Sequence, residues 1–303
     1  MNFRNLLRPA HALVVLSLIV LSGCESIEPE RRSSPTAPSM VRPASAVIAP
    51  NIAMSIAPTP SMAPTIFADS AILIDAVTGR TIYEKNANSR RQVASTQKLL
   101  TALLIAERGA LDGTITIAAS DTQVEPVKLS LRAGQQYSRR SLLTAVMVKS
   151  SNDATAALAR DHSGSNEAFM QAMNFRASRL GAESSYFANP HGLPAAQFST
   201  ARDVARIAFL AYRQPELRSM MLLPSYTFRF NNGRTKYLDA TNKLLTRSPI
   251  FNGMKTGYTI AAGRCLVTSA SYGGRQVILV QLGSRTKFIF DDAERIIRWA
   301  LNT

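Results

Sequence analysis

The sequence predicts a mixed α/β fold of the α+β type, in which one antiparallel sheet is flanked by helices. Strand patterns lie at both ends of the folded region, and helical patterns fill the middle. We therefore expect the terminal strands to pair in one sheet and the helices to pack against it. The chain has 303 residues, of which 46% are hydrophobic and 18% charged, so it is able to bury a substantial core.

The predicted elements begin near residue 67. Two strands, at 71–75 and 80–84, flank the turn Ala76-Val77-Thr78-Gly79. A helix starts at Ser95, because apolar residues then recur at three-to-four spacing from Leu99. Further helical patterns cover 140–161, 167–180 and 200–213, and further strand patterns cover 226–230, 235–238 and 253–259. A hairpin of 264–271 and 275–283 about Tyr272-Gly273-Gly274 precedes an amphipathic helix at 290–301.

The first residues predict export. Arg4 and Arg8 precede an apolar run at 12–21, which as a helix rises about 15 Å, half of a bilayer core. This pattern is typical of a secretory signal. The run ends in Leu21-Ser22-Gly23-Cys24, which resembles a bacterial lipobox. We therefore expect residues 1–23 to be a lipoprotein signal peptide and Cys24 to carry lipid, the alternative being a chance cysteine.

Residues 24–66 predict a disordered tether. The stretch from Glu25 to Ile66 holds eight of the fifteen prolines and contains no aromatic residue and no glycine. Such a composition cannot form a packed core. As a flexible coil it spans roughly 35 Å. We expect an exported protein, periplasmic or otherwise extracytoplasmic, whose folded domain at 67–303 is held at a membrane by Cys24.

The composition excludes several classes of protein. Two cysteines and three histidines leave no disulfide framework and no Cys-rich zinc site, and no H-E-x-x-H motif occurs, so we expect neither metal nor cofactor. The formal charge of +15 becomes +13 once Arg4 and Arg8 are removed with the signal. The 27 arginines and 8 lysines are spread along the domain. Export therefore favours an anionic cell wall over nucleic acid as the partner of this basic surface.

One segment predicts a serine nucleophile activated by an amine. Ser95 and Lys98 lie at i and i+3 of a helix start, about 5–6 Å apart at Cβ, so the lysine amine reaches the serine hydroxyl. The positive end of the helix stabilises developing negative charge there. A lysine near its usual pKa of about 10.4 is a poor base at neutral pH. The hypothesis therefore requires burial and a second lysine nearby.

Two further motifs follow in a fixed order. Ser150-Ser151-Asn152 is the only S-x-N in the chain, and Lys255-Thr256-Gly257 is the only K-T-G. The ordered set S-x-x-K, S-x-N, K-T-G is typical of penicillin-binding proteins and class A β-lactamases. From about 67 to 301, the chain resembles the D-alanyl-D-alanine carboxypeptidases among the low-molecular-mass penicillin-binding proteins. The resemblance is carried by the segments 94–102, 149–154, 189–193, 199–203 and 252–259.

The resemblance implies a β-lactamase/transpeptidase-like fold, with a mostly helical lobe beside the sheet and an active-site cleft between them. Carried over motif by motif, Ser95 is the nucleophile and Lys98 is its base. Ser150 relays a proton to the departing amine, and Asn152 holds the backbone amide of the substrate. These four residues are the expected catalytic set.

The K-T-G strand is implied to bind the substrate. Lys255 supplies the second cation and favours a terminal carboxylate, to which Thr256 donates a hydrogen bond. Gly257 lets the substrate approach without a Cβ in the way. The backbone N–H groups of Ser95 and Tyr258 are implied to form the oxyanion hole.

One departure from the family pattern concerns carboxylate recognition. Family members often carry an arginine just before an Asn-x-Leu-Leu stretch. Here Thr241 precedes Asn242-Lys243-Leu244-Leu245. Recognition of the carboxylate is then expected to rest on Lys255 and Thr256, or on another arginine such as Arg264.

The function implied by the resemblance is that of a serine D,D-carboxypeptidase. It would cleave the terminal D-Ala-D-Ala bond of peptidoglycan stem pentapeptides through an acyl-enzyme, with β-lactam antibiotics as covalent inhibitors. A D,D-endopeptidase acting on cross-linked peptidoglycan would use the same residues. A β-lactamase is disfavoured, because no E-x-x-L-N segment lies between Asn152 and Lys255. A non-catalytic wall-binding module is the alternative outside enzyme chemistry.

Overall fold

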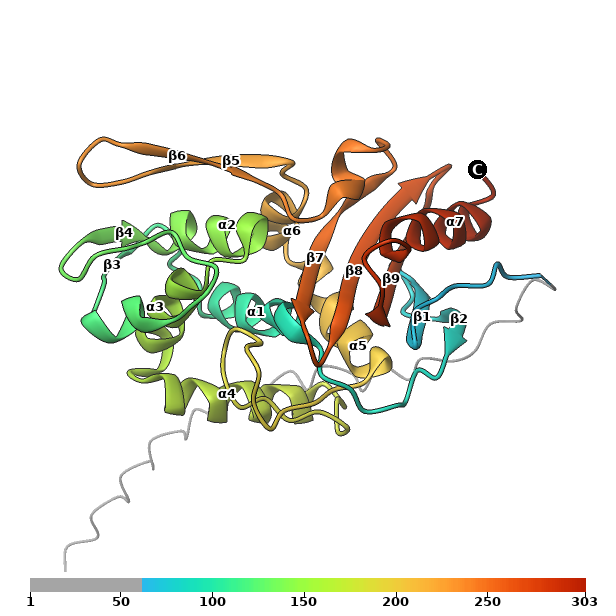
Figure 1. Cartoon of the computed structure of the whole chain (residues 1–303), viewed down its shortest axis with the longest axis horizontal. Helices are drawn as coiled ribbons and strands as arrows, with labels where there is room; N and C mark the ends of the chain where they lie inside the picture. Colours follow the sequence, from blue (N-terminus) through green and yellow to red (C-terminus); the bar gives the residue numbers. More distant parts are fainter. Residues whose placement is uncertain (1–61) are drawn as a thin grey trace, which may run out of the picture. The chain divides into compact units, whose positions relative to one another are not determined.

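The computed structural model describes residues 62–303 (Figure 1). The expected signal peptide at 1–23, the expected lipid site Cys24 and the tether up to residue 61 lie outside the described residues. The packed domain begins at Ile66, which is fully buried. The backbone carbonyl of Ile66 accepts a hydrogen bond from Lys85 Nζ at 2.9 Å.

A five-stranded antiparallel sheet has the order β2-β1-β9-β8-β7 (Figure 1). As predicted, strands from the two ends of the domain pair in one sheet, with Leu73 of β1 opposite Leu279 of β9. Strand β7 is therefore an edge strand of the sheet, and its unpaired side faces the helices (Figure 1). The strands are β1 (Ser70–Asp75), β2 (Thr81–Lys85), β7 (Phe251–Thr259), β8 (Gly263–Tyr272) and β9 (Arg275–Ser284).

Both faces of this sheet are covered, because apolar residues occupy alternating positions on both sides of the central strands. Leu73 and Leu279 pack in one buried cluster with helix α7 (Ile289–Leu301). Ile72 and Ile278 belong to the opposite cluster, which includes helix α5 (Ala201–Arg213).

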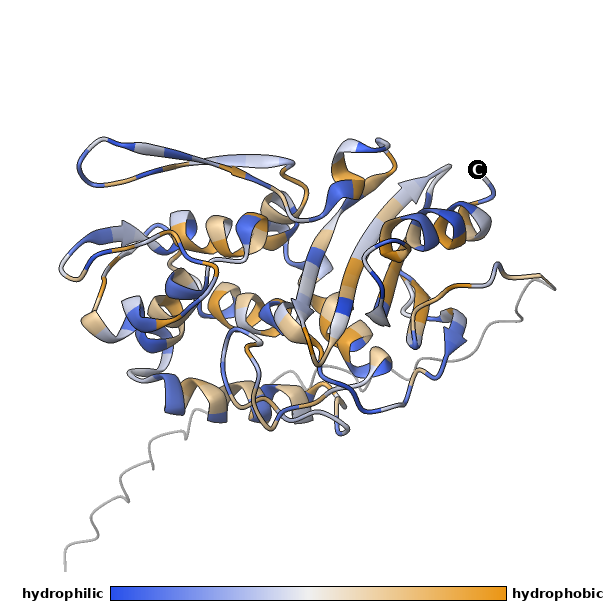
Figure 2. Ribbon diagram, viewed as in Figure 1, coloured by the Kyte–Doolittle hydropathy of each residue, from blue (hydrophilic) through white to orange (hydrophobic). Residues whose placement is uncertain are grey.

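The helical lobe is built around α1 (Lys98–Arg108). Every residue of α1 from Lys98 to Ile105 is buried. Figure 2 shows that much of the α1 ribbon is coloured as hydrophobic. The other helices are α2 (Arg139–Lys149), α3 (Asn152–Ser163), α4 (Asn166–Arg179) and α6 (Pro215–Met221). Short elements are η1 (Ala94–Gln97), β3 (Thr114–Thr116), η2 (Ala119–Gln123), β4 (Gln136–Ser138), β5 (Ser225–Arg229), β6 (Thr235–Asp239) and η3 (Lys243–Thr246).

The helical pattern at 140–161 is two helices rather than one. Ser150 ends α2 in the left-handed conformation, with φ at 70°. The chain then turns through Ser151, and the N–H of Asn152 donates to the carbonyl of Val127 at 2.6 Å. A contact with a remote loop therefore interrupts a continuous helical pattern. The hairpin β3–β4 and helix α6, which the sequence analysis did not predict, are both short.

No helix between Met62 and Thr303 combines the length and the apolar character needed to cross a bilayer.

Candidate active site

Ser95 lies on η1, one turn before Lys98 begins α1. The amine of Lys98 donates to Ser95 Oγ at 3.0 Å, as the i, i+3 spacing predicts. Ser95 Oγ in turn donates to the backbone carbonyl of His191 at 3.2 Å. The serine hydroxyl is therefore held between a buried amine and a carbonyl oxygen.

Lys98 is fully buried and has two further acceptors. Its Nζ lies 2.7 Å from Asn152 Oδ1 and 2.5 Å from the His191 carbonyl. A neutral amine has two hydrogens and one lone pair. When the two hydrogens are donated to Asn152 and His191, the lone pair is left to accept the proton of Ser95.

The electrostatics of the site favour that neutral amine. Burial, and secondly the positive charge of Lys255, hold the pKa of Lys98 well below its usual range. Lys255 is also fully buried, on β7, where it donates to the carbonyl of Thr256 at 3.0 Å. Burial lowers the pKa of Lys255 to about 7. Lys255 is thus the second lysine that the S-x-x-K hypothesis requires.

The loop at 189–193 is fastened to the start of α1. Gln97 Nε2 donates to the Asn189 carbonyl at 2.5 Å, and Thr101 Oγ1 donates to the Pro190 carbonyl at 2.6 Å. Gly192 has φ at 81°, and a Cβ there would lie 2.1 Å from the carbonyl oxygen of Ala94. Only glycine fits so close to η1. This packing places the backbone carbonyl of His191 within hydrogen-bond distance of Ser95 and Lys98.

His191 contributes its backbone carbonyl to the site, and its imidazole has no assigned role. Burial, with the charge of Lys98 second, lowers the pKa of the His191 imidazole to about 3, so the ring is neutral at physiological pH. Sequence reasoning assigned no role to this residue, although the segment Asn189–Leu193 was part of the family resemblance. A carbonyl oxygen carries no signature of residue type, so the motif itself was the only available signal.

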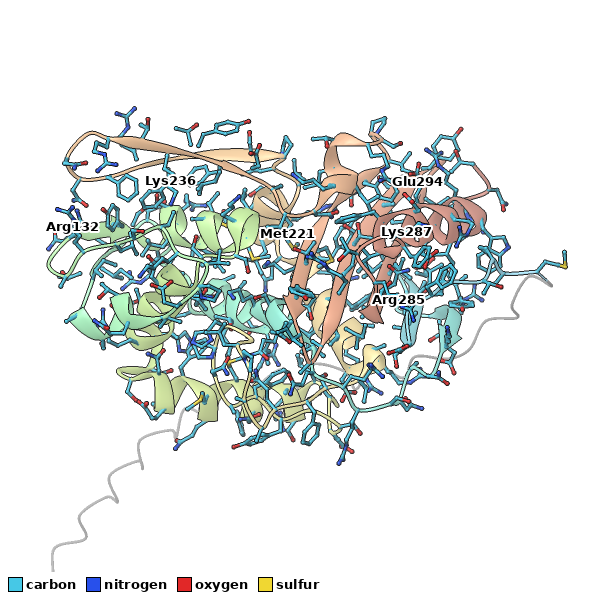
Figure 3. All side chains as sticks on the ribbon, in the orientation of Figure 1. Arg132, Met221, Lys236, Arg285, Lys287 and Glu294 are labelled. Carbon is cyan, nitrogen blue, oxygen red and sulfur yellow. The ribbon has the colours of Figure 1, made fainter. Side chains whose placement is uncertain are left out.

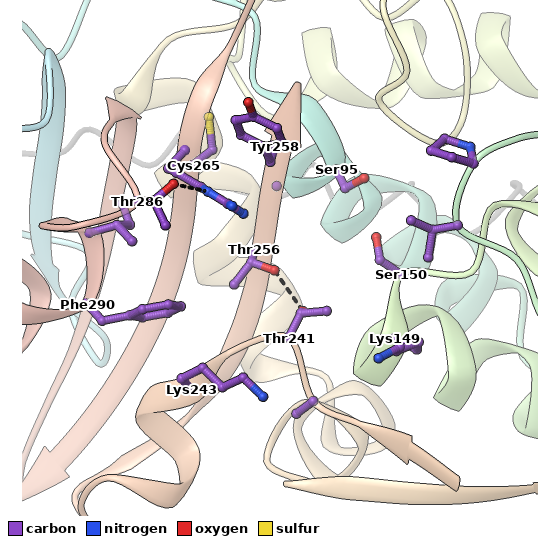
Figure 4. A pocket seen from close by; sticks show the side chains of 16 residues that line it. Ser95, Lys149, Ser150, Thr241, Lys243, Thr256, Tyr258, Cys265, Thr286 and Phe290 are labelled. Carbon is purple, nitrogen blue, oxygen red and sulfur yellow. Dashed lines mark hydrogen bonds between the residues drawn. The ribbon is translucent and has the colours of Figure 1, made fainter. Parts of the chain in front are cut away.

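Ser150 and Asn152 lie on opposite sides of the turn between α2 and α3. Ser150 is more than nine-tenths buried, and its hydroxyl faces the cleft and has no hydrogen-bond partner within residues 62–303 (Figure 4). Asn152 accepts from Lys98 and donates through Nδ2 to the carbonyl of Glu125 at 3.4 Å. The left-handed backbone of Ser150 is what allows the S-x-N segment to present both side chains to the site.

Asp153 fixes one wall of the site and was missed by the sequence analysis. Its buried carboxylate accepts hydrogen bonds from the N–H groups of Leu129, Ser130 and Leu131 at 2.9–3.1 Å. These bonds hold the loop that places Val127 on the wall of the cleft. A carboxylate that accepts several backbone N–H groups locks the loop in one conformation.

The K-T-G segment lies on the sheet edge beside η1. Thr256 Oγ1 donates to Thr241 Oγ1 at 2.7 Å, so the residue in the place of the family arginine contacts the motif directly (Figure 4). Tyr258 is 54% exposed, and the guanidinium of Arg264 lies over its ring at 4.3 Å from the centroid. Arg264 also donates to Thr286 Oγ1 at 2.9 Å.

The packing of β7 against η1 also requires a glycine at position 257, in addition to the approach of substrate. A Cβ at this position would lie 2.7 Å from the backbone nitrogen of Ser95 and 3.0 Å from the Cβ of Ala94. The missing side chain therefore lets β7 pack against the backbone that carries the nucleophile.

A cleft of about 580 Å³ connects these groups (Figure 4). Its lining includes cationic side chains but no aspartate or glutamate. No group of three or more His, Cys, Asp or Glu residues suited to hold a metal ion occurs in the part of the chain that the structure describes. The lining residues are Ser95, Pro126, Val127, Lys149, Ser150, Ala240, Thr241, Lys243, Thr256, Gly257, Tyr258, Arg264, Cys265, Thr286, Ile289 and Phe290.

Comparison with known proteins agrees with this geometry. Residues 57–286 match the S11 peptidase family, described as D-alanyl-D-alanine carboxypeptidase. The chain belongs to the S11 family. It is a serine-type D-alanyl-D-alanine peptidase of peptidoglycan, a family that acts on the cell wall outside the cytoplasm.

Individual relatives include both types of S11 peptidase. A D-alanyl-D-alanine endopeptidase of Pseudomonas aeruginosa is 33% identical over 76% of each chain. One of Escherichia coli is 31% identical over 82% of each chain. The crystal structure of a D-alanyl-D-alanine carboxypeptidase from Mycobacterium tuberculosis superposes with a TM-score of 0.77 at 29% identity, covering 82% of this chain and 97% of that one. The transpeptidase-like fold expected from the sequence is thereby confirmed.

The buried Lys255 makes the stability of the peptidase depend on pH. Its folded pKa of about 7 lies below the unfolded value of about 10.4, so the unfolded state binds more protons between these limits. The contribution of Lys255 to the free energy of unfolding is therefore unfavourable below pH 7 and rises as the pH increases toward 10. Urea unfolding of the wild type and Lys255→Met from pH 6 to 9.5 measures this. We expect the variant to be the more stable of the two at pH 6, by a margin that shrinks with increasing pH; a constant difference would contradict the assignment.

Gly257→Ala is expected to damage catalysis more than folding. The added Cβ must displace either β7 or the backbone of Ser95, and a displacement of about 1 Å at a reacting group costs about 100-fold in rate. The measurement is the rate of D-alanyl peptide cleavage beside thermal unfolding. Gly109→Ala is the control: its φ of 75° strains an alanine, but the space around its Cβ is empty and lies outside the site. Equal activity of the two variants would refute the packing argument.

Proposed function

We propose that this S11 peptidase cleaves the terminal D-Ala-D-Ala bond of peptidoglycan stem pentapeptides through an acyl-enzyme on Ser95. The observation that supports this most directly is the hydrogen bond of 3.0 Å between Ser95 Oγ and the buried amine of Lys98, whose pKa is held well below its usual range by burial and by the charge of Lys255. A neutral amine in contact with a serine hydroxyl is a competent general base.

Acylation follows from this geometry. Ser95 Oγ attacks the carbonyl carbon of the penultimate D-alanine while its proton passes to Lys98 Nζ. The backbone N–H groups of Ser95 and Tyr258 stabilise the oxyanion. As the C–N bond breaks, Ser150 gives its proton to the leaving amine and is reprotonated from Lys98. The buried, unpartnered hydroxyl of Ser150 on the cleft wall fits this role.

Deacylation uses water as the second nucleophile. Lys98 again accepts a proton, now from the water that attacks the ester carbonyl, and returns it to Ser95 Oγ as the ester C–O bond breaks and the free carboxylate is released. During both steps Asn152 holds the substrate amide, whereas Lys255 and Thr256 attract the terminal carboxylate only until it departs with the leaving D-alanine. Gly257 keeps β7 close enough to Ser95 for the two N–H groups to converge.

The same serine is expected to react with β-lactams and to release them slowly. A β-lactam acylates the nucleophile as a substrate does, but its leaving group remains attached. The lining of the cleft contains no carboxylate to activate a hydrolytic water. Slow turnover therefore makes β-lactams covalent inhibitors.

A second reaction of the same site is D,D-endopeptidase cleavage of a cross-link. It differs only in the leaving group, which is a neighbouring stem peptide rather than free D-alanine. Two of the relatives described above carry the name D-alanyl-D-alanine endopeptidase. We keep both reactions, while a purely wall-binding role is disfavoured by a complete acylation site.

Ser95→Ala is expected to abolish catalysis without unfolding the domain, because the hydroxyl is the only atom lost and its neighbours are side chains and carbonyls that remain. The measurements are release of D-alanine from a stem pentapeptide, cleavage of a cross-linked dimer, and labelling by a fluorescent penicillin. Each should fall to background in the variant, while thermal unfolding stays close to that of the wild type. If the wild type shows no Ser95-dependent reaction with any of the three, the proposal is wrong.

We further propose that residues 1–23 are a signal peptide and that a lipidated Cys24 anchors the enzyme to a membrane. The lipobox-like segment before Cys24 supports this. The intact mass of protein extracted from membranes should correspond to a chain beginning at Cys24 with added lipid. In Cys24→Ala the protein should move to the soluble fraction; an unmodified Cys24 in the wild type would refute the anchor.

A further inference from the structure

Two lysines lie on opposite walls of the cleft. Lys149 is the last residue of α2 and immediately precedes Ser150. Lys243 begins η3, two residues after Thr241. Figure 4 shows their ammonium groups directed into the cleft from opposite sides. We call these two residues the lysine pair.

Within residues 62–303, the lysine pair has no acidic partner. Neither amine forms a salt bridge or a side-chain hydrogen bond with another residue of the stretch 62–303, and no carboxylate lines the cleft. Elsewhere the domain pairs its cations readily: Arg139, for example, forms an ion pair with Asp161, and Arg160 one with Asp121. The cleft therefore has a concentration of uncompensated positive charge, to which Arg264 contributes.

The pair lies on the side of the site through which the leaving group departs. This step rests on the proposed function, in which Ser150 protonates the leaving amine and Thr256 binds the carboxylate beside it. Lys149 adjoins Ser150 in the chain, and the hydroxyl of Thr241, near Lys243, is hydrogen-bonded to Thr256. We therefore infer that a peptide that continues beyond the scissile nitrogen passes between the two lysines, both of which line the cleft.

The cleft is larger than one amino acid needs. A volume of about 580 Å³ lies within the range that holds drug-sized ligands. A leaving D-alanine occupies a small part of it and carries one carboxylate, which the motif residues already receive. A leaving stem peptide fills the remaining space and carries additional carboxylates.

We propose that the lysine pair binds carboxylates of a leaving stem peptide and so makes the enzyme prefer cross-linked peptides over release of free D-alanine. The selectivity comes from opposite charge on flexible side chains. A lysine is a point charge that adapts to carboxylates at different positions. Ser150, more than nine-tenths buried at the same wall, has a hydroxyl with no partner among residues 62–303, and this hydroxyl marks where the leaving nitrogen meets the surface.

The test compares two substrates across lysine variants of the full-length enzyme. The substrates are a D,D-cross-linked muropeptide dimer and a monomeric stem pentapeptide, with products quantified by chromatography. In Lys149→Gln combined with Lys243→Gln, we expect kcat/KM for the dimer to fall about tenfold, mainly through KM, as expected for loss of a charge-assisted hydrogen bond. The value for the pentapeptide should change less than about threefold. Each single variant should show an intermediate loss.

Two controls separate charge from size and from folding. Lys236→Gln removes the same charge from the β5–β6 hairpin, outside the cleft (Figure 3), and should leave the substrate ratio unchanged. A dimer whose leaving stem is amidated at every carboxylate except the one beside the leaving nitrogen keeps the size but loses the additional charge, and the wild type should cleave it about as poorly as the double variant cleaves the acidic dimer. Thermal unfolding of every variant verifies the fold.

The outcomes are distinguishable. A proportional fall for both substrates, or no change for the dimer, would overturn the role of the lysine pair while Ser95-dependent cleavage persisted. Equal cleavage of the acidic and amidated dimers by the wild type would also overturn it. Absence of Ser95-dependent cleavage of either substrate would instead refute the proposed function itself.

Discussion

The arrangement of this active site depends on two lysines that are fully buried and that have no carboxylate partner in the part of the chain that the structure describes. Lys98 and Lys255 are held apart from solvent, and burial lowers the pKa of both. A carboxylate beside Lys98 would restore its proton and remove the base. The surroundings therefore supply neutral oxygens, namely the Asn152 amide and the His191 carbonyl, which position the amine without charging it.

The fold brings these groups together from four separate parts of the chain. The centre of the helical lobe holds Lys98, the turn between two helices holds Asn152, a fastened loop supplies the His191 carbonyl, and the sheet edge carries Lys255. Two glycines, Gly192 and Gly257, let the loop and the strand approach the backbone around Ser95 from two sides. A site held on packed helices and a sheet edge keeps its geometry better than one held on free loops.

The sequence predicts the parts of this design that depend on residue type and local spacing. The contact between Ser95 and Lys98 follows from one helical turn, and the pairing of β1 with β9 follows from strand patterns at both ends of the domain. The break between the two helices at Ser150 cannot be predicted in this way, because the helical pattern of the sequence continues through it. At the break, Asn152 contacts Val127, which is remote in the sequence. The His191 carbonyl is equally invisible, since a backbone atom has no residue-type signature.

The structure shows where the basic residues of the sequence lie and which of them are paired with acids. Many arginines of the domain are committed to ion pairs, as Arg139 and Arg160 are, and so contribute little field at the cleft. The family arginine before Asn242 is absent, and Thr241 in its place bonds to Thr256. A rigid guanidinium fork holds one carboxylate in one geometry, whereas two lysines on facing walls accept several carboxylates in variable positions. We infer that replacing the first by the second widens the range of leaving groups that the cleft accepts, while the chemistry at Ser95 stays the same.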